Sequence, residues 1–188
     1  MTNRLSTIVT KTGDTGTTGL ADGQRLPKSH PRICAIGEVD TLNSHIGLLI
    51  SQLQHMNSNE IEQHLGLLSS IQHALFDLGS ELAIPGYNAL SESILTKIEQ
   101  SIESMLEQLP PLKEFILPGG TQEASQSHIC RSVSRCSERA LVALNNEEPI
   151  SDLSMQLVNR LSDYFFVLAR ELNRLAKRTD IFWQKSEQ

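Results

Sequence analysis

Apolar residues in this chain recur at intervals of three and four positions, and this spacing constrains the fold more than any other feature. Side chains at such intervals lie on one face of an α-helix. The pattern holds over five stretches, which run from Pro31 to about His55, from Asn59 to about Leu82, from Leu90 to Leu109, from about Gln122 to Asn145 and from about Asp152 to Lys177. No stretch alternates apolar and polar residues for long enough to indicate a sheet. The sequence therefore predicts an all-α fold, a five-helix up-and-down bundle.

Residues that begin and end helices stand between these stretches. Pro31 suits the first turn of a helix, because the backbone N–H that proline lacks has no helical partner there. Asn59 and Ser91 are the predicted N-caps of the second and third helices, and the third helix is predicted to end at Pro110. On the fourth helix, the face predicted to enter the core carries Ile129, Val133, Cys136, Ala140 and Leu144.

A chain of 188 residues can bury one substantial core, and no internal repeat marks a second domain. We predict a single domain over residues 1–188, with an N-terminal segment (1–30), a helical bundle (31–177) and a C-terminal tail (178–188). The apolar stripes are more continuous than a lone bundle requires. An oligomer that buries the surplus and a well-covered monomer both remain open on this pattern alone.

Charge and composition argue against several classes of partner. The chain has 16 Lys and Arg against 22 Asp and Glu, and the net charge of −6 gives no general reason to expect nucleic acid or an anionic membrane. No run of 18 apolar residues exists, and the first 30 residues are polar, so we expect a cytoplasmic protein without a membrane segment. Cys34, Cys130 and Cys136 form no CxxC pair and are expected to be reduced thiols of the core. The histidines show no spacing typical of a metal site.

The N-terminal segment TKTGDTGTTGL (residues 10–20) is the least helical part of the chain. Three glycines alternate with five threonines, and Lys11 adds a positive charge. Glycines let successive backbone N–H groups turn toward an anion, and hydroxyl groups add donors. The motif is neither a Walker A loop nor a GxGxxG fingerprint. Two interpretations remain open, a phosphate-binding loop and a flexible arm.

The fourth predicted helix has an unusual polar side. His128, Arg131, Arg135 and Glu138 step by three, four and three residues and therefore share a face. Paired guanidinium groups suit recognition of phosphate oxygens, and a carboxylate beside them can orient the arginines or approach a phosphate-bound Mg²⁺. The alternative is a solvated face crossed by local ion pairs.

Two more polar positions lie close to apolar stripes. Asp40 stands beside the stripe of the first helix, and a charge there requires a partner; Arg131 or Arg135 is the candidate, within the chain or across a subunit interface. Asn159 and Asp163 share one side of the fifth helix. The alternative for these positions is ordinary polarity at the edge of a helix.

Seven motifs taken together resemble the PduO-type ATP:cob(I)alamin adenosyltransferases in order and spacing, over nearly the whole chain. They are TKTGDTGTTGL (10–20), RLPK (25–28), GEVDTLNSHIGL (37–48), LFDLGSELA (75–83), FILPGG (115–120), HICRSVSRCSER (128–139) and NRLSDYFFVLAR (159–170). The resemblance implies a five-helix bundle that forms a homotrimer, with ATP and the corrinoid meeting at each subunit interface. It implies transfer of the 5′-deoxyadenosyl group of ATP to the cobalt of cob(I)alamin, with release of triphosphate.

The resemblance also implies roles for individual residues. The positions that match the ATP site of the family are Thr10, Lys11, Thr12, Gly13, Thr18, Gly19, Lys28, Arg135, Glu138, Arg139 and Asn159. Asp40 and Arg131 match an ion pair between subunits. No protein metal site is implied, because Mg²⁺ is expected through the ATP phosphates. Partners implied by the reaction are a reductase and an acceptor enzyme that uses adenosylcobalamin.

Phe115 stands where the family has a phenylalanine that displaces the lower axial ligand of the corrinoid. Together with Arg135 and Glu138 it is expected to be catalytic. An apolar wedge that excludes water is a reasonable role for an isolated aromatic residue between polar segments. Without the resemblance, Phe115 would be interpreted as an anchor for its loop.

Two positions depart from the family, and a second class of function stays open. Thr15 stands where many members have Asp, and Cys136 where some have Arg, which puts phosphate affinity in question. The alternative function is a corrinoid- or nucleotide-binding carrier that delivers cofactor without alkylating it. A carrier does not need a site for a triphosphate leaving group, so the loop together with Arg135, Glu138 and Phe115 favours catalysis.

Overall fold

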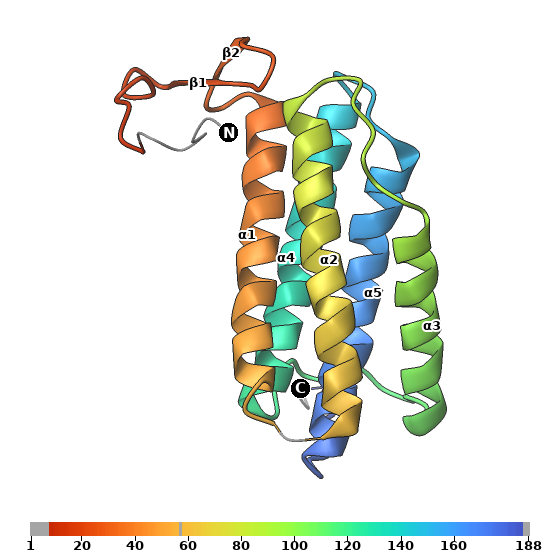
Figure 1. Ribbon diagram of the computed structural model, residues 1–188. Coiled ribbons are helices and arrows are strands. Elements are labelled where there is room, and N and C mark those ends of the chain that lie inside the picture. Colours follow the sequence, from red (N-terminus) through yellow and green to blue (C-terminus); the bar gives the residue numbers. More distant parts are fainter. Residues whose placement is uncertain (1–7, 57, 186–188) are drawn as a thin grey trace.

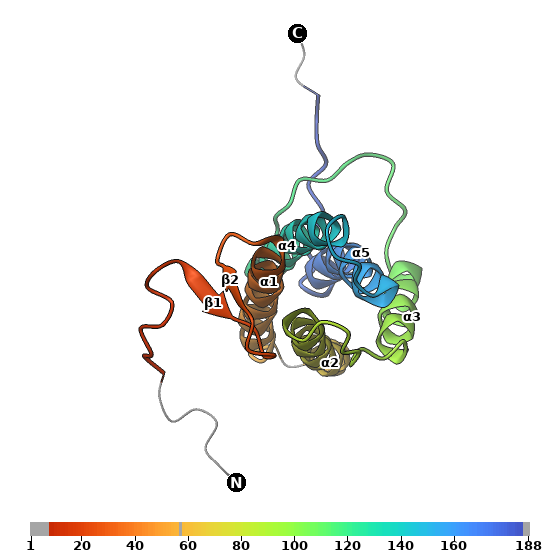
Figure 2. The ribbon, with the colours of Figure 1, turned by 90° about the horizontal axis from the view of Figure 1, so that it is seen from above.

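Five long helices make up most of the chain in the computed structural model, which describes residues 8–56 and 58–185. They are α1 (Pro31–Leu53), α2 (Asn59–Ala83), α3 (Ser93–Gln108), α4 (Gln122–Asn145) and α5 (Asp152–Leu175). Successive helices run in opposite directions along the bundle (Figure 1). Seen from above, they form a ring in the order α1, α4, α5, α3 and α2 (Figure 2). The predicted five-helix bundle is confirmed.

Short polar side chains cap the start of most of these helices. Ser58 accepts a hydrogen bond from the backbone N–H of Ile61 at 3.2 Å, and Thr121 accepts one from Ala124 at 3.1 Å. The predicted caps of α2 and α3 are wrong by one position. Ser58, whose backbone is extended, takes the role assigned to Asn59. At α3 the cap residue is Glu92, which makes no side-chain cap bond.

The core follows the apolar stripes, with the aromatic pair Tyr164 and Phe165 of α5 fully buried. The two rings meet edge to face, with centroids 5.3 Å apart. Burial raises the pKa of Tyr164 above its usual range. Helix α5 contacts both α4 and α3. It carries more buried residues than any of the other four helices and therefore contributes most to the core.

The predicted core face of α4 is wrong except at Leu144, which is buried. Ile129 is 44% exposed, and the buried face carries mostly small residues followed by two leucines: Ala124, Ser127, Cys130, Ser134, Ser137, Leu141 and Leu144. Two of the buried serines donate hydrogen bonds to backbone carbonyls of other helices: Ser127 to Phe165 (2.8 Å) and Ser137 to Glu38 (2.9 Å). Small side chains let neighbouring helices approach closely, which a count of apolar residues does not reveal.

The cysteines do not share one environment, contrary to the expectation from sequence. Cys130 is buried, Cys136 is half-buried and Cys34 is exposed. Burial raises the pKa of the Cys130 thiol to about 12. Only Cys130 is a core thiol. The buried face of α4 includes Cys130 rather than the predicted Cys136, and Cys34 lies at an exposed position of α1.

Helix α1 is, among the described residues, the one helix long and apolar enough by composition to cross a membrane. Its mean hydropathy reaches 1.2 over 18 residues, yet Val39, Leu42, Ile46 and Leu49 are each at most 2% exposed inside the bundle. The core helix of a bundle has this composition, so the value is weak evidence for a membrane span.

A two-stranded hairpin precedes the bundle, although the sequence predicted no sheet. Strands β1 (Thr17–Gly19) and β2 (Arg25–Pro27) pair antiparallel, with Thr18 opposite Leu26. Three residues per strand are too few to show alternation in a sequence. The buried side chain of Leu20 and a hydrogen bond from the Ala21 N–H to the Ala83 carbonyl (3.3 Å) attach the hairpin to the bundle.

Two irregular regions lie at opposite ends of the bundle (Figure 1). The hairpin lies beside the first residues of α1, whereas the chain from 109 to 121 crosses the far end and leads into α4. A helix of 24 residues such as α4 spans roughly 36 Å. After α5 ends at Leu175, two residues before the predicted Lys177, residues 178–185 form an extended C-terminal segment at that same far end. Residues 1–7 and 186–188 of the predicted N-terminal segment and tail lie outside the described residues.

Candidate active site

The Gly/Thr loop, residues 10–20, is an ordered turn stabilised by Arg25. The Arg25 guanidinium donates hydrogen bonds to the carbonyl of Thr12 (2.7 Å) and to the carbonyl and hydroxyl of Thr17 (3.2 and 2.9 Å). Gly16 has a φ of +85°, a conformation that favours glycine. These contacts favour a shaped loop over a flexible arm. Arg25 was not among the predicted site residues, although it begins the RLPK motif.

Lys28 brings its ammonium group to this loop. The Lys28 N–H bonds to the carbonyl of Gly16 at 2.9 Å, and a Cβ on Gly13 would lie 3.2 Å from Lys28 Nζ. Gly13 therefore leaves room for the ammonium group beside the backbone. Thr10, Lys11 and Thr12 are exposed next to it, with the two threonine hydroxyls 3.0 Å apart. The loop presents donors and positive charge to solvent at its outer side.

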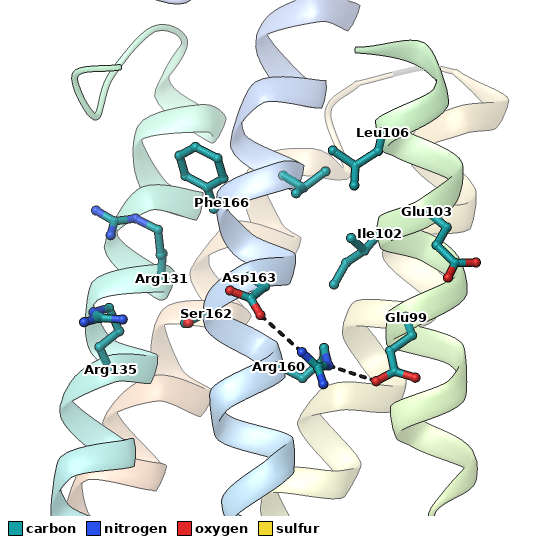
Figure 3. Close-up of a pocket in the computed structure, with 11 residues that line it drawn as sticks. Glu99, Ile102, Glu103, Leu106, Arg131, Arg135, Arg160, Ser162, Asp163 and Phe166 are labelled. Atoms are coloured by element: carbon teal, nitrogen blue, oxygen red, sulfur yellow. Dashed lines mark hydrogen bonds and ion pairs between the residues drawn. The ribbon is translucent and has the colours of Figure 1, made fainter. Parts of the chain in front are cut away.

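The middle of α4 presents arginines that have no acidic partner within residues 8–56 and 58–185. Arg131 is half-buried and Arg135 exposed one turn later (Figure 3). Burial, with a smaller contribution from Arg135, lowers the pKa of Arg131. The interpretation of this face as a set of local ion pairs is therefore wrong. Two neighbouring unpaired guanidinium groups favour an anion.

Glu138 and Asn159 connect α4 to α5 beside these arginines. Glu138 Oε1 accepts a hydrogen bond from Asn159 Nδ2 at 2.8 Å. Arg139 contacts the sulfur of Cys136 at 3.1 Å and is otherwise exposed. The structure thus brings the predicted residues of the fourth and fifth helices together.

Asp163 instead belongs to another cluster. Arg160 donates to Asp163 at 3.3 Å and to Glu99 of α3 at 2.9 Å (Figure 3). This cluster lines a cavity of about 600 Å³, which Arg131 and Arg135 also reach. The cavity therefore has acidic as well as basic walls.

His128 does not lie with the arginines as a charged group. Its side chain is 4% exposed and meets Phe166 edge to face, with centroids 6.2 Å apart. Burial, with a smaller contribution from Arg131, lowers the pKa of His128 to about 4. The imidazole is neutral near pH 7 and forms part of an apolar wall rather than a phosphate site.

Phe115 stands over a cavity of about 560 Å³ at the far end of the bundle. The cavity is lined by residues 112–116 and Pro118 of the loop and by His128, Arg131 and Phe166 of the helices. Arg131 and Phe166 also line the cavity of Figure 3, so the two hollows share a wall. The Phe115 ring is 81% exposed and does not pack its own loop. This exposure disfavours the interpretation of Phe115 as a loop anchor.

Asp40 is exposed on α1 and makes no ion pair within the described residues. A pair with Arg131 or Arg135 inside one chain is therefore not formed. Asp40 follows the buried Val39 and so lies beside the stripe as predicted, but its side chain is exposed in one chain.

Fold and site together define a helical-bundle protein in which two neighbouring guanidinium groups, without an acidic partner in the described part of the chain, lie beside a partly apolar cavity. A site of this kind suits a phosphate-bearing substrate and a second, larger one. The chain belongs to the cobalamin adenosyltransferase family, whose model matches residues 8–172. The resemblance seen in the sequence is confirmed, and with it the helical-bundle fold and the enzyme class.

Relatives and solved structures agree with this membership. The chain is 50% identical to the cobalamin adenosyltransferase of Cupriavidus metallidurans over 188 residues, which is 100% of both chains. It is 40% identical to the corrinoid adenosyltransferase of Bacillus subtilis, over 95% of this chain and 93% of that one. A phenylalanine-to-alanine variant of the PduO-type ATP:corrinoid adenosyltransferase from Lactobacillus reuteri, complexed with cobalamin and ATP, superposes with a TM-score of 0.88 at 37% identity, covering 95% of this chain and 100% of that chain.

Proposed function

We propose that this chain transfers the 5′-deoxyadenosyl group of ATP to the cobalt of cob(I)alamin or a related corrinoid and releases triphosphate. The observation that carries the proposal is the juxtaposition of Arg131 and Arg135, which form no ion pair among the described residues, with the cavity that Phe115 lines. An anionic substrate and a large ring-shaped substrate can meet there. Family membership gives the two substrates their chemical identity.

ATP is assigned to the Gly/Thr loop and to the polar side of α4 and α5. The loop residues are Thr10, Lys11, Thr12, Gly13, Thr18, Gly19 and Lys28, and the helix residues are Arg135, Glu138, Arg139 and Asn159. Hydroxyl, ammonium and guanidinium donors suit phosphate oxygens. In the described residues no group of three potential ligands could hold a metal ion by itself. A single carboxylate with a free oxygen, as Glu138 has, fits Mg²⁺ held mainly by phosphates.

The two parts of this ATP site lie in different places on one protomer. The Gly/Thr loop projects from one end of the bundle, beside α1, whereas the segment 109–121, which carries Phe115, crosses the other end (Figure 1). We infer that the loop of one copy serves the α4 and α5 surface of a neighbouring copy, in a homotrimer. The exposed Asp40 is then available for an ion pair with Arg131 across the interface. The partly exposed Ile129 and Val133 of α4 are apolar surface that such an interface would cover.

Chemistry at the site requires positioning more than proton transfer. Cob(I)alamin is a strong nucleophile, and its cobalt attacks C5′ of ATP. A cobalt–carbon bond forms, the C5′–O bond breaks, and triphosphate leaves with the electron pair. Arg135, Lys28 and the loop donors hold the triphosphate and stabilise its growing charge. Mg²⁺ on the phosphates would supply further charge neutralisation.

Phe115 is proposed to act on the corrinoid before the transfer. Its exposed ring over the cavity can occupy the lower face of the corrin and keep water and the nucleotide base away from cobalt. Cob(II)alamin without a lower ligand accepts an electron more easily. The neutral His128 and Phe166 extend the same apolar wall, so no cationic imidazole faces the substrate.

The test of the activity is direct. The protein is mixed with Mg-ATP and cobalamin reduced beforehand to Co(I), and the light-sensitive cobalt–carbon product and triphosphate are measured together. Equal amounts of both support the proposal. Tight binding of both substrates without product would indicate the carrier function instead.

The shared site has its own test, by mixing two variants in an assay that starts from Co(II) cobalamin and a reductant, where both variants are expected to be nearly inactive. Lys28→Ala damages the loop and Phe115→Ala damages the cavity. If the loop of one copy serves its neighbour, co-folded mixtures of the two variants regain sites with both residues intact and recover activity. Mixtures that stay as inactive as each variant alone would contradict the shared site. We further expect the enzyme to act in the cytoplasm, with a reductase that supplies Co(I) and an acceptor enzyme that uses the product.

A further inference from the structure

Arg170 of α5 joins two segments that lie far apart in the sequence. Its side chain is 4% exposed in a bundle whose interior is otherwise mostly apolar. Arg170 Nε donates to the carboxylate of Asp180 at 2.9 Å, and the terminal nitrogen Nη2 donates to the carbonyl of Pro110 at 2.7 Å. One guanidinium group therefore holds the start of the loop 109–121, here called the Phe115 loop, and the C-terminal segment 178–185.

Asn173, one turn further along α5, holds the other end of the same loop. It is 2% exposed. Its Oδ1 accepts from the N–H of Thr121 at 3.0 Å, and its Nδ2 donates to the carbonyl of Gly119 at 3.2 Å and to Asp180 at 3.4 Å. All three hydrogen bonds of this side chain thus go to the loop or to Asp180.

At position 120 the loop approaches Asn173 so closely that only glycine fits there. Gly120 has a φ of +113°, and a Cβ built there would collide with the amide group of Asn173. This close contact fixes the backbone at Gly120. Pro118, two residues earlier, lines the same cavity as Phe115. The loop is therefore held at both of its ends by buried side chains of α5.

The C-terminal segment then pairs with the residues around Phe115 itself. The N–H of Trp183 donates to the carbonyl of Phe115 at 2.7 Å, and the N–H of Leu117 donates to the carbonyl of Ile181 at 2.8 Å. Ile116 and Phe182 form an antiparallel bridge between these bonds. Since the Phe115 ring is 81% exposed, its own packing does not fix it, and its place follows from the backbone that carries it.

We propose that Arg170, Asn173 and Asp180 are positioning residues, which tie the Phe115 loop and the C-terminal segment into one unit and thereby set where Phe115 stands over the corrinoid. The inference rests on the function proposed above for Phe115. Arg170 and Asn173 touch neither substrate in this assignment. They act through the backbone of the loop.

The main test variant is Asp180→Ala, which removes the shared acceptor of Arg170 and Asn173 but leaves the apolar core unchanged. Trp183→Pro is a second variant, because proline lacks the N–H that bonds to the Phe115 carbonyl. It changes a residue outside the helices, so the bundle can fold normally. Glu60→Ala is the matched control. It removes an ion pair with Arg174 of α5 (3.0 Å), and among the described residues neither side chain forms a hydrogen bond with the loop or the C-terminal segment.

Each protein is assayed under two conditions, with Co(II) cobalamin and reduced flavin, and with cobalamin already reduced to Co(I) by titanium(III) citrate. For Asp180→Ala and Trp183→Pro we expect the rate from Co(II) to fall at least fivefold. The rate from Co(I) and the KM for ATP should stay within about twofold. The spectrum of bound Co(II) should lose its four-coordinate component, and Glu60→Ala should behave like the parent.

Two outcomes would overturn the proposal. Equal rate losses under both conditions would mean that these residues only stabilise the fold, and an unchanged Co(II) spectrum with parental rates would mean that they do not position Phe115. Failure of the proposed function looks different, since the parent protein itself would then form no adenosylated product from Co(I). Circular dichroism of each variant identifies any general loss of structure.

Discussion

The two irregular ends of this bundle are held in contrasting ways. The Gly/Thr loop and its hairpin are held mainly by backbone hydrogen bonds between the two strands and by the Arg25 side chain. The hydrogen bonds of Arg25 are exposed to solvent. The Phe115 loop is fastened by Arg170 and Asn173, which are almost completely buried. Both ends carry residues assigned to one reaction.

The difference indicates what each end does. A loop that reaches out to a substrate on a neighbouring copy must be anchored at its base and free on its outer side. A loop that forms one wall of a cavity must keep its distance from the opposite wall. Buried hydrogen bonds at both of its ends are suited to that second task. Four predictions test this comparison.

The largest effect is expected on assembly, from a change in the ion pair proposed between Asp40 of one copy and Arg131 of another. Asp40→Asn removes the proposed intersubunit partner of Arg131, and a guanidinium left unpaired inside the proposed interface costs about 3–5 kcal/mol. Analytical ultracentrifugation should show dissociation at concentrations where the parent protein stays assembled. Asp77→Asn, at an exposed position of α2, is the control. Identical assembly of both variants would contradict the interface.

The buried anchoring of the Phe115 loop can be broken by one methyl group. Gly120→Ala forces a strained backbone and displaces Asn173, so the free energy of unfolding should fall by about 2–4 kcal/mol in urea denaturation. Gly66→Ala is the matched control. Gly66 is at an exposed position of α2, and nothing lies within 4 Å of a Cβ added there. That change should stabilise the helix by about 0.5–1 kcal/mol. Similar stability of the two variants would be inconsistent with a tightly held loop.

Acid should weaken the end of the bundle that contains His128. The pKa of His128 is about 4 in the folded chain and about 6.5 when unfolded, because burial disfavours the cation. As the pH falls below 6.5 the unfolded state binds the proton first, so the free energy of unfolding decreases until about pH 4, by up to about 3 kcal/mol. His128→Gln should reduce this slope, whereas His73→Gln, at an exposed position, should not. His64, whose pKa is also lowered by burial, contributes in the same direction in all variants.

The smallest of the four effects concerns ATP alone. Lys28→Ala and Arg135→Ala each remove a charged donor worth about 1.5–3 kcal/mol, so the affinity for ATP should fall about tenfold or more. The melting temperature should change little, because both residues are exposed. Lys97→Ala on α3 is the control for loss of a surface charge. Parental ATP affinity in either variant would remove that residue from the site.

Local patterns in the sequence were sufficient to predict the positions of the helices and to identify the family. Helix periodicity is a property of neighbouring residues, and four of the five helices begin within one residue of the predicted position, such as Pro31 and Gln122. The motifs around Phe115 and Arg135 identify the family for the same reason. They are short and continuous in the chain.

Only the tertiary structure decided which face of α4 is buried and what holds Phe115. The buried serines of α4 are polar by composition, and their suitability depends on acceptors such as the carbonyls of Phe165 and Glu38, which other helices supply. The role of Asn173 likewise depends on Gly119 and Thr121, more than 50 positions away in the sequence. Hydrogen bonds between distant segments leave no periodic signal, because each requires the whole chain to be folded before donor and acceptor meet.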